Sequence, residues 1–385
     1  MSSSEDDAVD LGPLTGIRVI DLTSNVAAPF GSVILADLGA DVLHVEAPKG
    51  DDCRRMAPSF GHGSAYFSVV NRNKSCISLD IRTPKDRSLL DDLIAEADVF
   101  VTNLRPGKLT ALRLDAASLV GPYPRLIHAS LSAYGQSGSE RDKPGYDAVL
   151  QARTGIASVT GESDGPPVRS GVSILDVGAG TWLALGVLAA LYERQVTGRG
   201  RAVSTSLFET GASWVSYHLA AHQVTGNPSQ RHGSGHPAFA PYGIYRTQEG
   251  EICIGIGGDH LFEELCDAIG RNDLVDDERF HSNSDRAQNV DELRTELERT
   301  FESRSAVDWA RALSDRGLPV DAVNQPEELL TDPQSRETGV LQDLIGPHGR
   351  PMRIPGLPIT FNGERPRFRS PAPELSDPDH SSLRD

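Results

Sequence analysis

The chain has 385 residues, of which 38% are hydrophobic and 24% are charged, as is typical of a globular protein with two domains. The net charge of −17 at pH 7 argues against a nucleic-acid partner, because binding to phosphates requires a basic surface. The same charge predicts a protein adapted to high salt, because salt screens the repulsion between its acidic groups. The four cysteines and eleven histidines show no metal-ligand or disulfide spacing, so we expect reduced thiols and no metal site.

Residues 1–10 are polar, acidic and rich in serine, which predicts a disordered leader. The sequence shows no long apolar stretch or signal peptide at this end, so we expect a cytoplasmic protein without a membrane partner. We therefore expect the folded part of the chain to begin at residue 11.

The first folded segment alternates between a strand, a helix and a second strand. Residues 17–22 and 41–46 are strand-like, and residues 29–38 are helical. Such a βαβ unit builds a parallel sheet. Glu46 ends the second strand, where an acid would bind the ribose of NAD, but the turn at residues 23–29 lacks the glycine-rich fingerprint. The sequence therefore argues against a dinucleotide site here.

The pattern of strands and helices then repeats, which extends the predicted parallel sheet. We expect strands at residues 76–80, 99–102 and 126–130, and a helix from Thr83–Pro84 to about Glu96. In such sheets, ligands bind in the loops at the carboxyl ends of the strands. The candidate ligand loops are residues 51–55, 103–107 and 133–138, with ordinary turn chemistry as the alternative.

Two acids, Asp147 and Asp176, stand in a setting of glycine, proline and apolar residues. The uncharged run from Thr181 to Leu191 is apolar on every face, which predicts a buried helix that begins near Asp176. The helix dipole favours a carboxylate at that end, whereas burial disfavours one. A carboxylate held at this balance suits a nucleophile. The alternative is that Asp176 only caps the helix.

The chain changes character after about residue 226. Beyond a polar, glycine-rich linker at residues 227–237, hairpin and helical patterns predict a second, smaller α+β region. Prolines break up the stretch after about residue 321. Before the linker we expect a strand at residues 201–206 and a helix at residues 207–223. Beyond it we expect strands at residues 242–246 and 251–256, and helices at residues 261–269, 290–301 and 306–316.

Separated motifs occur at residues 14–22, 36–42, 103–107, 145–147, 160–161, 165–167, 236–237 and 240–243. In this order they resemble those of the family III CoA-transferases, and the resemblance covers the chain from Leu11 to the tail. It implies an α/β fold with a Rossmann-like large domain at residues 11–226, a smaller α+β domain at residues 227–330 and a C-terminal segment, 331–385, that returns to the large domain. It also implies an interlocked homodimer.

The resemblance implies a role for each of the two acids. It assigns the covalent nucleophile to Asp176, in preference to the capping role, and it places Asp147 close to the reacting thioester. Arginines suit the phosphates of CoA, because guanidinium binds phosphate bidentately. The implied contacts to CoA or substrate are Leu79, Arg82, Asn103, Leu104, Arg105, Pro144, Gly145, Tyr146 and His236.

The implied reaction moves CoA from an acyl-CoA donor to a carboxylic acid through an aspartyl-CoA thioester, with no tightly bound cofactor. We expect N–H groups around Gly178 and Gly180 to stabilise the oxyanions. Succinyl-CoA as donor and mesaconate or a similar dicarboxylate as acceptor are a working guess. Where the oxalate-specific family members have a substrate glutamine and a CoA-facing arginine, this chain has Val26 and Ala111, with Arg113 as a nearby substitute. These changes argue against oxalate and formate.

Two alternatives to CoA transfer remain open. A racemase of α-methylacyl-CoA thioesters would need a histidine base where this chain has Tyr146, and a phenol is a poor base at neutral pH. The other alternative is a CoA-binding protein without catalysis, which would form no covalent adduct.

Overall fold

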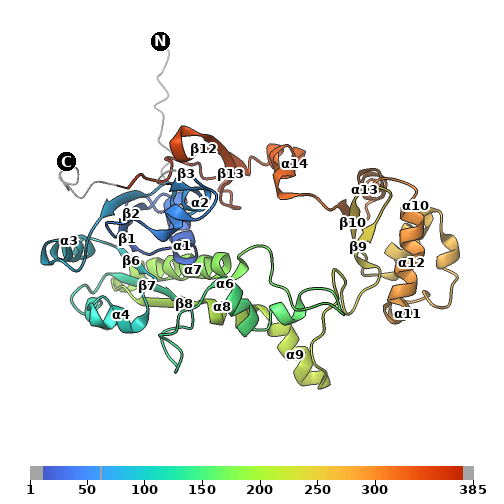
Figure 1. Cartoon of the computed structure of the whole chain (residues 1–385), viewed down its shortest axis with the longest axis horizontal. Coiled ribbons are helices and arrows are strands. Elements are labelled where there is room, and N and C mark those ends of the chain that lie inside the picture. The colour runs from blue at the N-terminus through green and yellow to red at the C-terminus, as the bar shows by residue number, and fades with distance from the viewer. Residues whose placement is uncertain (1–11, 61–62, 376–385) are drawn as a thin grey trace, which may run out of the picture. The chain divides into compact units, whose positions relative to one another are not determined.

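The computed structural model describes residues 12–60 and 63–375, and their packing defines two units (Figure 1). The first unit contains the chain up to residue 155, residues 170–219 and the chain from residue 330 onward. The second unit contains residues 156–169 and 220–329. The predicted large domain, residues 11–226, includes residues 156–169 and 220–226, which this division assigns to the second unit. The predicted leader at residues 1–10 lies outside the described residues.

The first unit is built on a parallel six-stranded sheet of order β5-β2-β1-β6-β7-β8, as the alternation of strands and helices predicts. The order of the strands reverses between β1 and β6, so the topological switch point lies at the carboxyl ends of these two strands. The strands are β1 (Arg18–Leu22), β2 (Asp41–Glu46), β5 (Ser75–Ser78), β6 (Val99–Thr102), β7 (Ile127–Ser132) and β8 (Ala202–Ser206).

Helices cover both faces of this sheet (Figure 1). Three helices, α3 (Pro84–Ala95), α4 (Pro106–Ala111) and α5 (Ala116–Leu119), pack on the face that carries Ile20 and Phe100. Two others, α1 (Ala27–Asp37) and α7 (Ile174–Thr197), pack on each other and on the opposite face. Side chains alternate along a strand, so Asp21 lies on that opposite face, where it accepts a hydrogen bond from Ser32 of α1 at 2.7 Å.

Helices α1 and α7 approach closely because glycines lie where they cross. A Cβ atom on Gly180 would lie 2.4 Å from the carbonyl oxygen of Ala27, and a Cβ atom on Gly31 would lie 2.8 Å from that of Gly180. No larger side chain fits at this contact. The contact therefore fixes the first turns of α7 beside the start of α1.

The prediction that α7 is buried on every face is wrong. Trp182, Leu185, Tyr192 and Val196 are exposed, from 44% at Trp182 to 81% at Val196, and their spacing places them on one side of the helix. In the described part of the chain, α7 is the one helix with the length and composition of a membrane span. Half of its most apolar window is buried within the protein, as in a core helix.

Several elements differ from the predictions. The single helix predicted at residues 207–223 is broken at Val215 into α8 (Leu207–Trp214) and α9 (Ser216–Thr225). A hairpin of β12 (Leu341–Ile345) and β13 (Pro351–Pro355) lies in the proline-rich tail, where proline is tolerated at strand ends. The other elements not predicted are η1 (Asp52–Arg55), β3 (Ser59–Phe60), β4 (Gly63–Ser64), α2 (Ala65–Asn71), α4 (Pro106–Ala111), α5 (Ala116–Leu119), α6 (Asp147–Arg153), η2 (Ala157–Val159), η3 (Asn272–Leu274), α11 (Asn283–Gln288), β11 (Val320–Ala322), η4 (Pro326–Leu330), α14 (Pro333–Glu337) and η5 (Pro347–Gly349).

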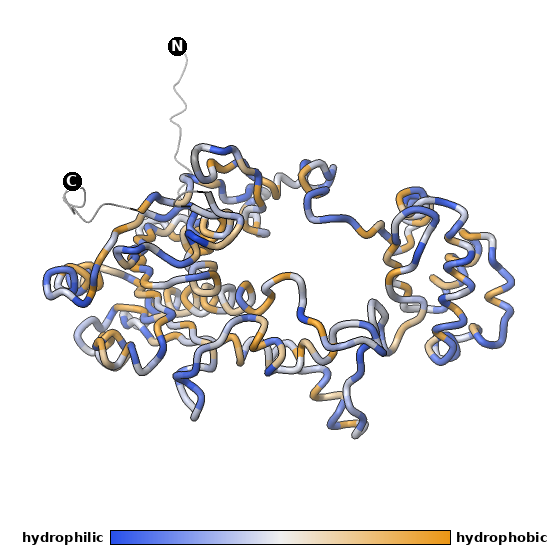
Figure 2. The backbone as a smooth tube through the Cα atoms, viewed as in Figure 1, coloured by the Kyte–Doolittle hydropathy of each residue, from blue (hydrophilic) through white to orange (hydrophobic). Residues whose placement is uncertain are grey.

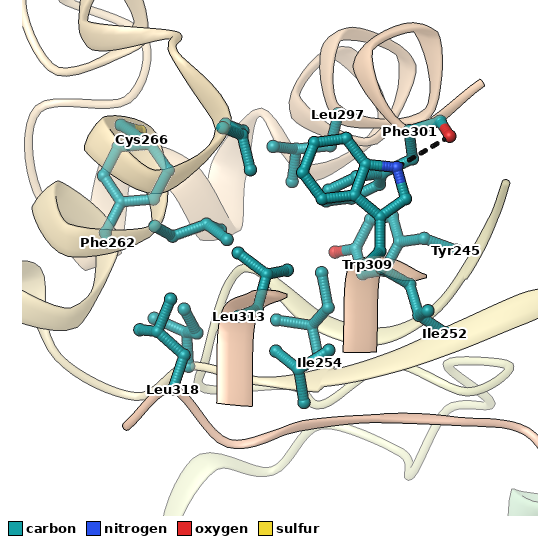
Figure 3. Packing of buried hydrophobic residues seen from close by; sticks show 14 of the residues in the cluster. Tyr245, Ile252, Ile254, Phe262, Cys266, Leu297, Phe301, Trp309, Leu313 and Leu318 are labelled. Carbon is teal, nitrogen blue, oxygen red and sulfur yellow. Dashed lines mark hydrogen bonds between the residues drawn. The ribbon is translucent and has the colours of Figure 1, made fainter. Parts of the chain in front are cut away.

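The second unit is an α+β structure with an antiparallel sheet of order β11-β10-β9. Hydrophobic residues recur every three or four positions along its helices, among hydrophilic ones (Figure 2), so each helix has one buried side. Aromatic side chains fill its core, where Trp309 donates a hydrogen bond to the Phe301 carbonyl at 3.0 Å (Figure 3). Its elements are β9 (Tyr242–Arg246), β10 (Glu251–Gly255), α10 (Asp259–Ile269), η3 (Asn272–Leu274), α11 (Asn283–Gln288), α12 (Val290–Phe301), α13 (Ala306–Ser314) and β11 (Val320–Ala322).

The glycine contact between α1 and α7 yields a stability prediction. Gly180→Ala adds a Cβ atom where the Ala27 carbonyl lies, so we expect it to lower the free energy of unfolding by about 1–3 kcal/mol. Gly121→Ala is the control, because a Cβ atom there meets nothing within 4 Å. Denaturant unfolding of both variants measures the difference. Equal stability of the two variants would contradict the close contact.

Candidate active site

The first turn of α7 carries Asp176, and α6 carries Asp147, whose carboxylate binds the N–H groups of this turn. Ser173 is the N-cap residue of α7, but its side chain makes no capping hydrogen bond. Instead, Asp147 Oδ2 accepts hydrogen bonds from the N–H groups of Leu175 at 2.8 Å and Asp176 at 3.3 Å. The first N–H groups of a helix lack partners within the helix, and its dipole favours an anion there. Asp147, rather than Asp176, therefore caps this helix.

Asp147 is itself held in place by a residue that the sequence analysis missed. Gln151 Nε2 donates to Asp147 Oδ1 at 2.6 Å, and Gln151 Oε1 accepts from the Ser170 N–H at 2.9 Å. Both Asp147 and Gln151 are buried. Gln151 follows Asp147 by one helical turn, so the i, i+4 spacing was the available signal. The chain of hydrogen bonds ties α6 to the segment that leads into α7.

The environment of Asp176 favours its protonated form. Burial, followed by the like charge of Asp147, raises the pKa of the Asp176 carboxyl to about 7. Its side chain is half-buried, and no hydrogen bond found in the described residues involves its carboxyl oxygens. A carboxylate with a pKa near neutrality and no fixed partner is more basic than an ordinary aspartate and still ionised in part at pH 7.

Gly178 and Gly180 do not supply the oxyanion donors that we expected. Both lie inside α7, where each N–H bonds to the carbonyl four residues earlier. Their lack of a side chain serves packing instead, since a Cβ atom on Gly178 would lie 2.3 Å from the ring of Trp214. That prediction is therefore wrong.

The start of α1 carries N–H groups that have no acceptor among the described residues. Val26, its N-cap residue, makes no side-chain capping bond, and no described residue accepts a hydrogen bond from the N–H of Ala27 or Ala28. The Ala27 carbonyl lies against Gly180, one helical turn beyond Asp176. Two unsatisfied donors are thus found beside the helix that carries Asp176.

A cavity of about 660 Å³ lies at the switch point of the sheet, at the carboxyl ends of β1, β2, β5 and β6. Four predicted contacts line it, namely Leu79, Arg82, Asn103 and Leu104. Part of the predicted ligand loop at residues 51–55 also lines it. Its other lining residues are Leu22, Thr23, Ser24, Val45, Glu46, Ala47, Pro48, Lys49, Gly50, Asp80, Ile81, Lys108 and Leu112.

Three cationic side chains line the cavity, although the chain as a whole is strongly acidic. Arg82 pairs with Asp80 at 2.7 Å, and Lys49 pairs with Asp52 at 3.5 Å. Lys108 forms no ion pair with any described residue, so its charge is available to an anion. Arg113, which we expected to substitute for the CoA-facing arginine, does not line the cavity.

The other predicted contacts lie outside the cavity. Arg105 is exposed and donates to the Asp142 carbonyl at 3.5 Å. Pro144–Tyr146 lead into α6, and the Tyr146 side chain is 71% exposed. His236 belongs to the second unit, where its ring stacks on Phe239 with 4.8 Å between centroids.

Glu46 and the potential metal ligands are the residues that bear on cofactor binding. Glu46, considered for a nucleotide ribose, binds Arg54 Nε at 2.8 Å and the Asp51 N–H at 2.7 Å, so its carboxylate is occupied by the protein. Across residues 12–60 and 63–375, no group of three or more His, Cys, Asp or Glu side chains could hold a metal ion. None of the four cysteines forms a disulfide.

Comparison with known proteins gives matches over nearly the whole chain. The family model for CoA-transferase family III matches residues 14–378. The acetyl-CoA:oxalate CoA-transferase of Acetobacter aceti is 37% identical over 369 residues, which cover 95% of this chain and 94% of that protein. The human succinyl-CoA:glutarate CoA-transferase is 32% identical over 374 residues, covering 96% and 85%. A crystal structure of a CAIB/BAIF family protein from Brucella suis has a TM-score of 0.85 and 33% identity, covering 96% and 98%.

The Asp147–Asp176 pair yields a prediction about pKa. Asp147→Asn removes the like charge, so we expect the pKa of Asp176 to fall below about 7, while burial, the larger cause, keeps it above the ordinary value. More of Asp176 would then be ionised at pH 6. Carboxyl carbon NMR titration measures the shift, with Asp115→Asn, which alters the cap of α5, as the control. An unchanged pKa of Asp176 would refute the coupling.

Proposed function

The chain belongs to CoA-transferase family III, and we propose that it moves CoA between small carboxylic acids through a covalent bond to Asp176. The observation that carries this proposal is the Asp176 carboxyl, half-buried, with its pKa raised to about 7, on the helix turn that Asp147 holds. Its position in the chain matches the nucleophile implied by the family resemblance.

In the first half of the proposed reaction, the Asp176 carboxylate attacks the thioester carbonyl of the donor. The carbon–sulfur bond breaks, giving a mixed anhydride and the CoA thiolate. The thiolate then attacks the aspartyl carbonyl, and the donor acid leaves with the oxygen that had belonged to Asp176. The product on the enzyme is an aspartyl-CoA thioester. The acceptor acid reverses these steps, so bonds of similar energy are exchanged and no ATP is needed.

Two features of the surroundings of Asp176 support this chemistry. A raised pKa makes its carboxylate a better nucleophile while leaving a useful ionised fraction at neutral pH. The free N–H groups of Ala27 and Ala28 are the proposed oxyanion donors, a kind of interaction worth about 3 kcal/mol for one donor. Water must be kept from the anhydride, because hydrolysis would otherwise compete with transfer.

The cavity at the switch point is the proposed site for the nucleotide end of CoA. In parallel α/β sheets, ligands bind at such switch points. The unpaired Lys108, with Arg82 and Lys49, offers positive charge for phosphate groups in an otherwise acidic protein. Leu79 and Leu104 offer apolar surface in the same cavity.

We also propose the homodimer that the family resemblance implies. The exposed apolar side of α7, with Trp182, Leu185, Tyr192 and Val196, is the kind of surface that subunit contacts cover. The cytoplasmic location and the salt-adapted surface remain proposals that rest on composition, chiefly the net charge of −17.

The acids are proposed by analogy with the relatives. One relative is named for acetyl-CoA and oxalate, and the other for succinyl-CoA and glutarate. Oxalate is therefore again a candidate acceptor, although this chain has Val26 where the oxalate-specific family members have a glutamine. A dicarboxylate of four or five carbons, such as glutarate or mesaconate, with succinyl-CoA as donor, remains our first choice.

The experiment incubates the protein with succinyl-CoA or acetyl-CoA and with oxalate, glutarate or mesaconate, and detects new thioesters by mass spectrometry. Hydroxylamine trapping of the loaded enzyme should modify the peptide that contains Asp176. Asp176→Ala should lose this adduct and lower transfer by about a thousandfold or more, because it removes the carboxylate that forms the proposed intermediate. The exposed Asp92, on α3, gives a control variant, Asp92→Ala, with normal transfer.

The same experiment separates the alternatives. Near-normal transfer by Asp176→Ala would refute the covalent role. Binding of CoA without any adduct or transfer in the wild type would support a non-catalytic protein, and deuterium uptake at the α-carbon without acid exchange would support a racemase.

A further inference from the structure

The loop between β1 and α1, residues 23–26, is held from two sides. Asn103, after β6, accepts a hydrogen bond from the Ser24 N–H at 3.1 Å and donates one to the Ser24 carbonyl at 2.7 Å. Asp51, in the loop after β2, accepts a hydrogen bond from the Asn25 N–H at 3.1 Å. Ser24, Asp51 and Asn103 also line the cavity at the switch point. The residues that hold this loop are therefore part of the cavity wall.

The backbone of Asn25 is in the left-handed region, with φ of 66°. This conformation is unfavourable for residues other than glycine, although asparagine tolerates it better than most. It turns the chain from the cavity wall into α1, whose first residue, Ala27, lies against Gly180 of α7. The conformation of one residue thus links the cavity to the helix that carries Asp176.

Asp51 is a rigid anchor for this conformation. It is buried, and its carboxylate also accepts from the Cys53 N–H at 2.8 Å. His44 lies between Asp51 and Asp21, with its ring nitrogens 3.8 Å and 3.3 Å from their carboxylate oxygens. The buried Lys74 donates to Asp21 at 2.9 Å. Burying charged groups costs free energy unless they are paired, and here His44 and Lys74 lie among the buried acids as their partners.

On the basis of the proposed function, we propose that Asp51 is a positioning residue for the loading of CoA onto Asp176. Its carboxylate holds Asn25 in the left-handed conformation, which sets Ser24 in the cavity wall and the start of α1 beside α7. Asp51 does not touch the reacting atoms. It keeps the bound thioester aligned with the nucleophile, and small losses of such alignment lower the rate of reaction.

The test compares variants at both ends of the Asp51–Asn25 contact. Asn25→Val keeps the N–H that Asp51 binds, but a β-branched residue resists a positive φ, whereas Asn25→Gly accepts it readily. We expect the single-turnover rate of loading at saturating succinyl-CoA to fall about tenfold or more in Asp51→Ala and Asn25→Val. Asn25→Gly should stay within about threefold of the wild type.

A matched control is Asn362→Val, which places the same substitution at another left-handed asparagine, with φ of 52°, and should load at the wild-type rate. Thermal unfolding establishes that each variant is folded at the assay temperature, and the Asn25 pair decides the question if Asp51→Ala does not fold. Wild-type loading by Asn25→Val, or equal losses in Asn25→Val and Asn25→Gly, would overturn the positioning role. Absence of loading in the wild type, tried also with acetyl-CoA, would instead overturn the proposed function on which it rests.

Discussion

The structure of the candidate site depends on one interaction, the binding of the first turn of α7 by the carboxylate of Asp147. The same group satisfies the N–H groups of Leu175 and Asp176 and places a negative charge beside the Asp176 carboxyl. Capping stabilises the helix, while the like charge adds to the effect of burial and raises the pKa of Asp176. One buried acid thus positions the proposed nucleophile, Asp176, and raises the basicity of its carboxylate, and Gln151 holds that acid in turn.

The rest of the first unit connects this turn to the cavity. Glycines allow the backbones of α1 and α7 to come into direct contact, so a displacement of the start of α1 would also displace α7. The start of α1 is set by Asn25, which Asp51 holds at the edge of the cavity. A parallel sheet suits this arrangement because its strands and crossover helices meet at the same carboxyl edge. The cavity is built from the loops that follow β1, β2, β5 and β6, and the proposed nucleophile lies on α7, which connects β7 to β8.

Much of the fold could be predicted from the sequence, because alternating strands and helices leave a local hydrophobic pattern. The family resemblance, rather than that pattern, singled out Asp176 over an ordinary cap. The partners of individual side chains could not be predicted from the sequence. The hydrogen bond from Leu175 to Asp147 joins residues far apart in the chain, and Lys108 lies in the cavity wall because α4 begins directly after Asn103 and Leu104, which also line the cavity. The exposed side of α7 was also missed, since composition shows that a helix is apolar but not which side other groups cover.

The most direct measurement follows oxygen atoms through the reaction. If CoA is transferred through an anhydride with Asp176, each turnover leaves one oxygen of the acceptor acid on that side chain. Turnover with an acyl-CoA donor and an acceptor acid labelled with oxygen-18, followed by mass spectrometry of the peptides, should show the heavy isotope on Asp176 and only when both substrates are present. Transfer without label on Asp176, or label on a different residue, would contradict the account.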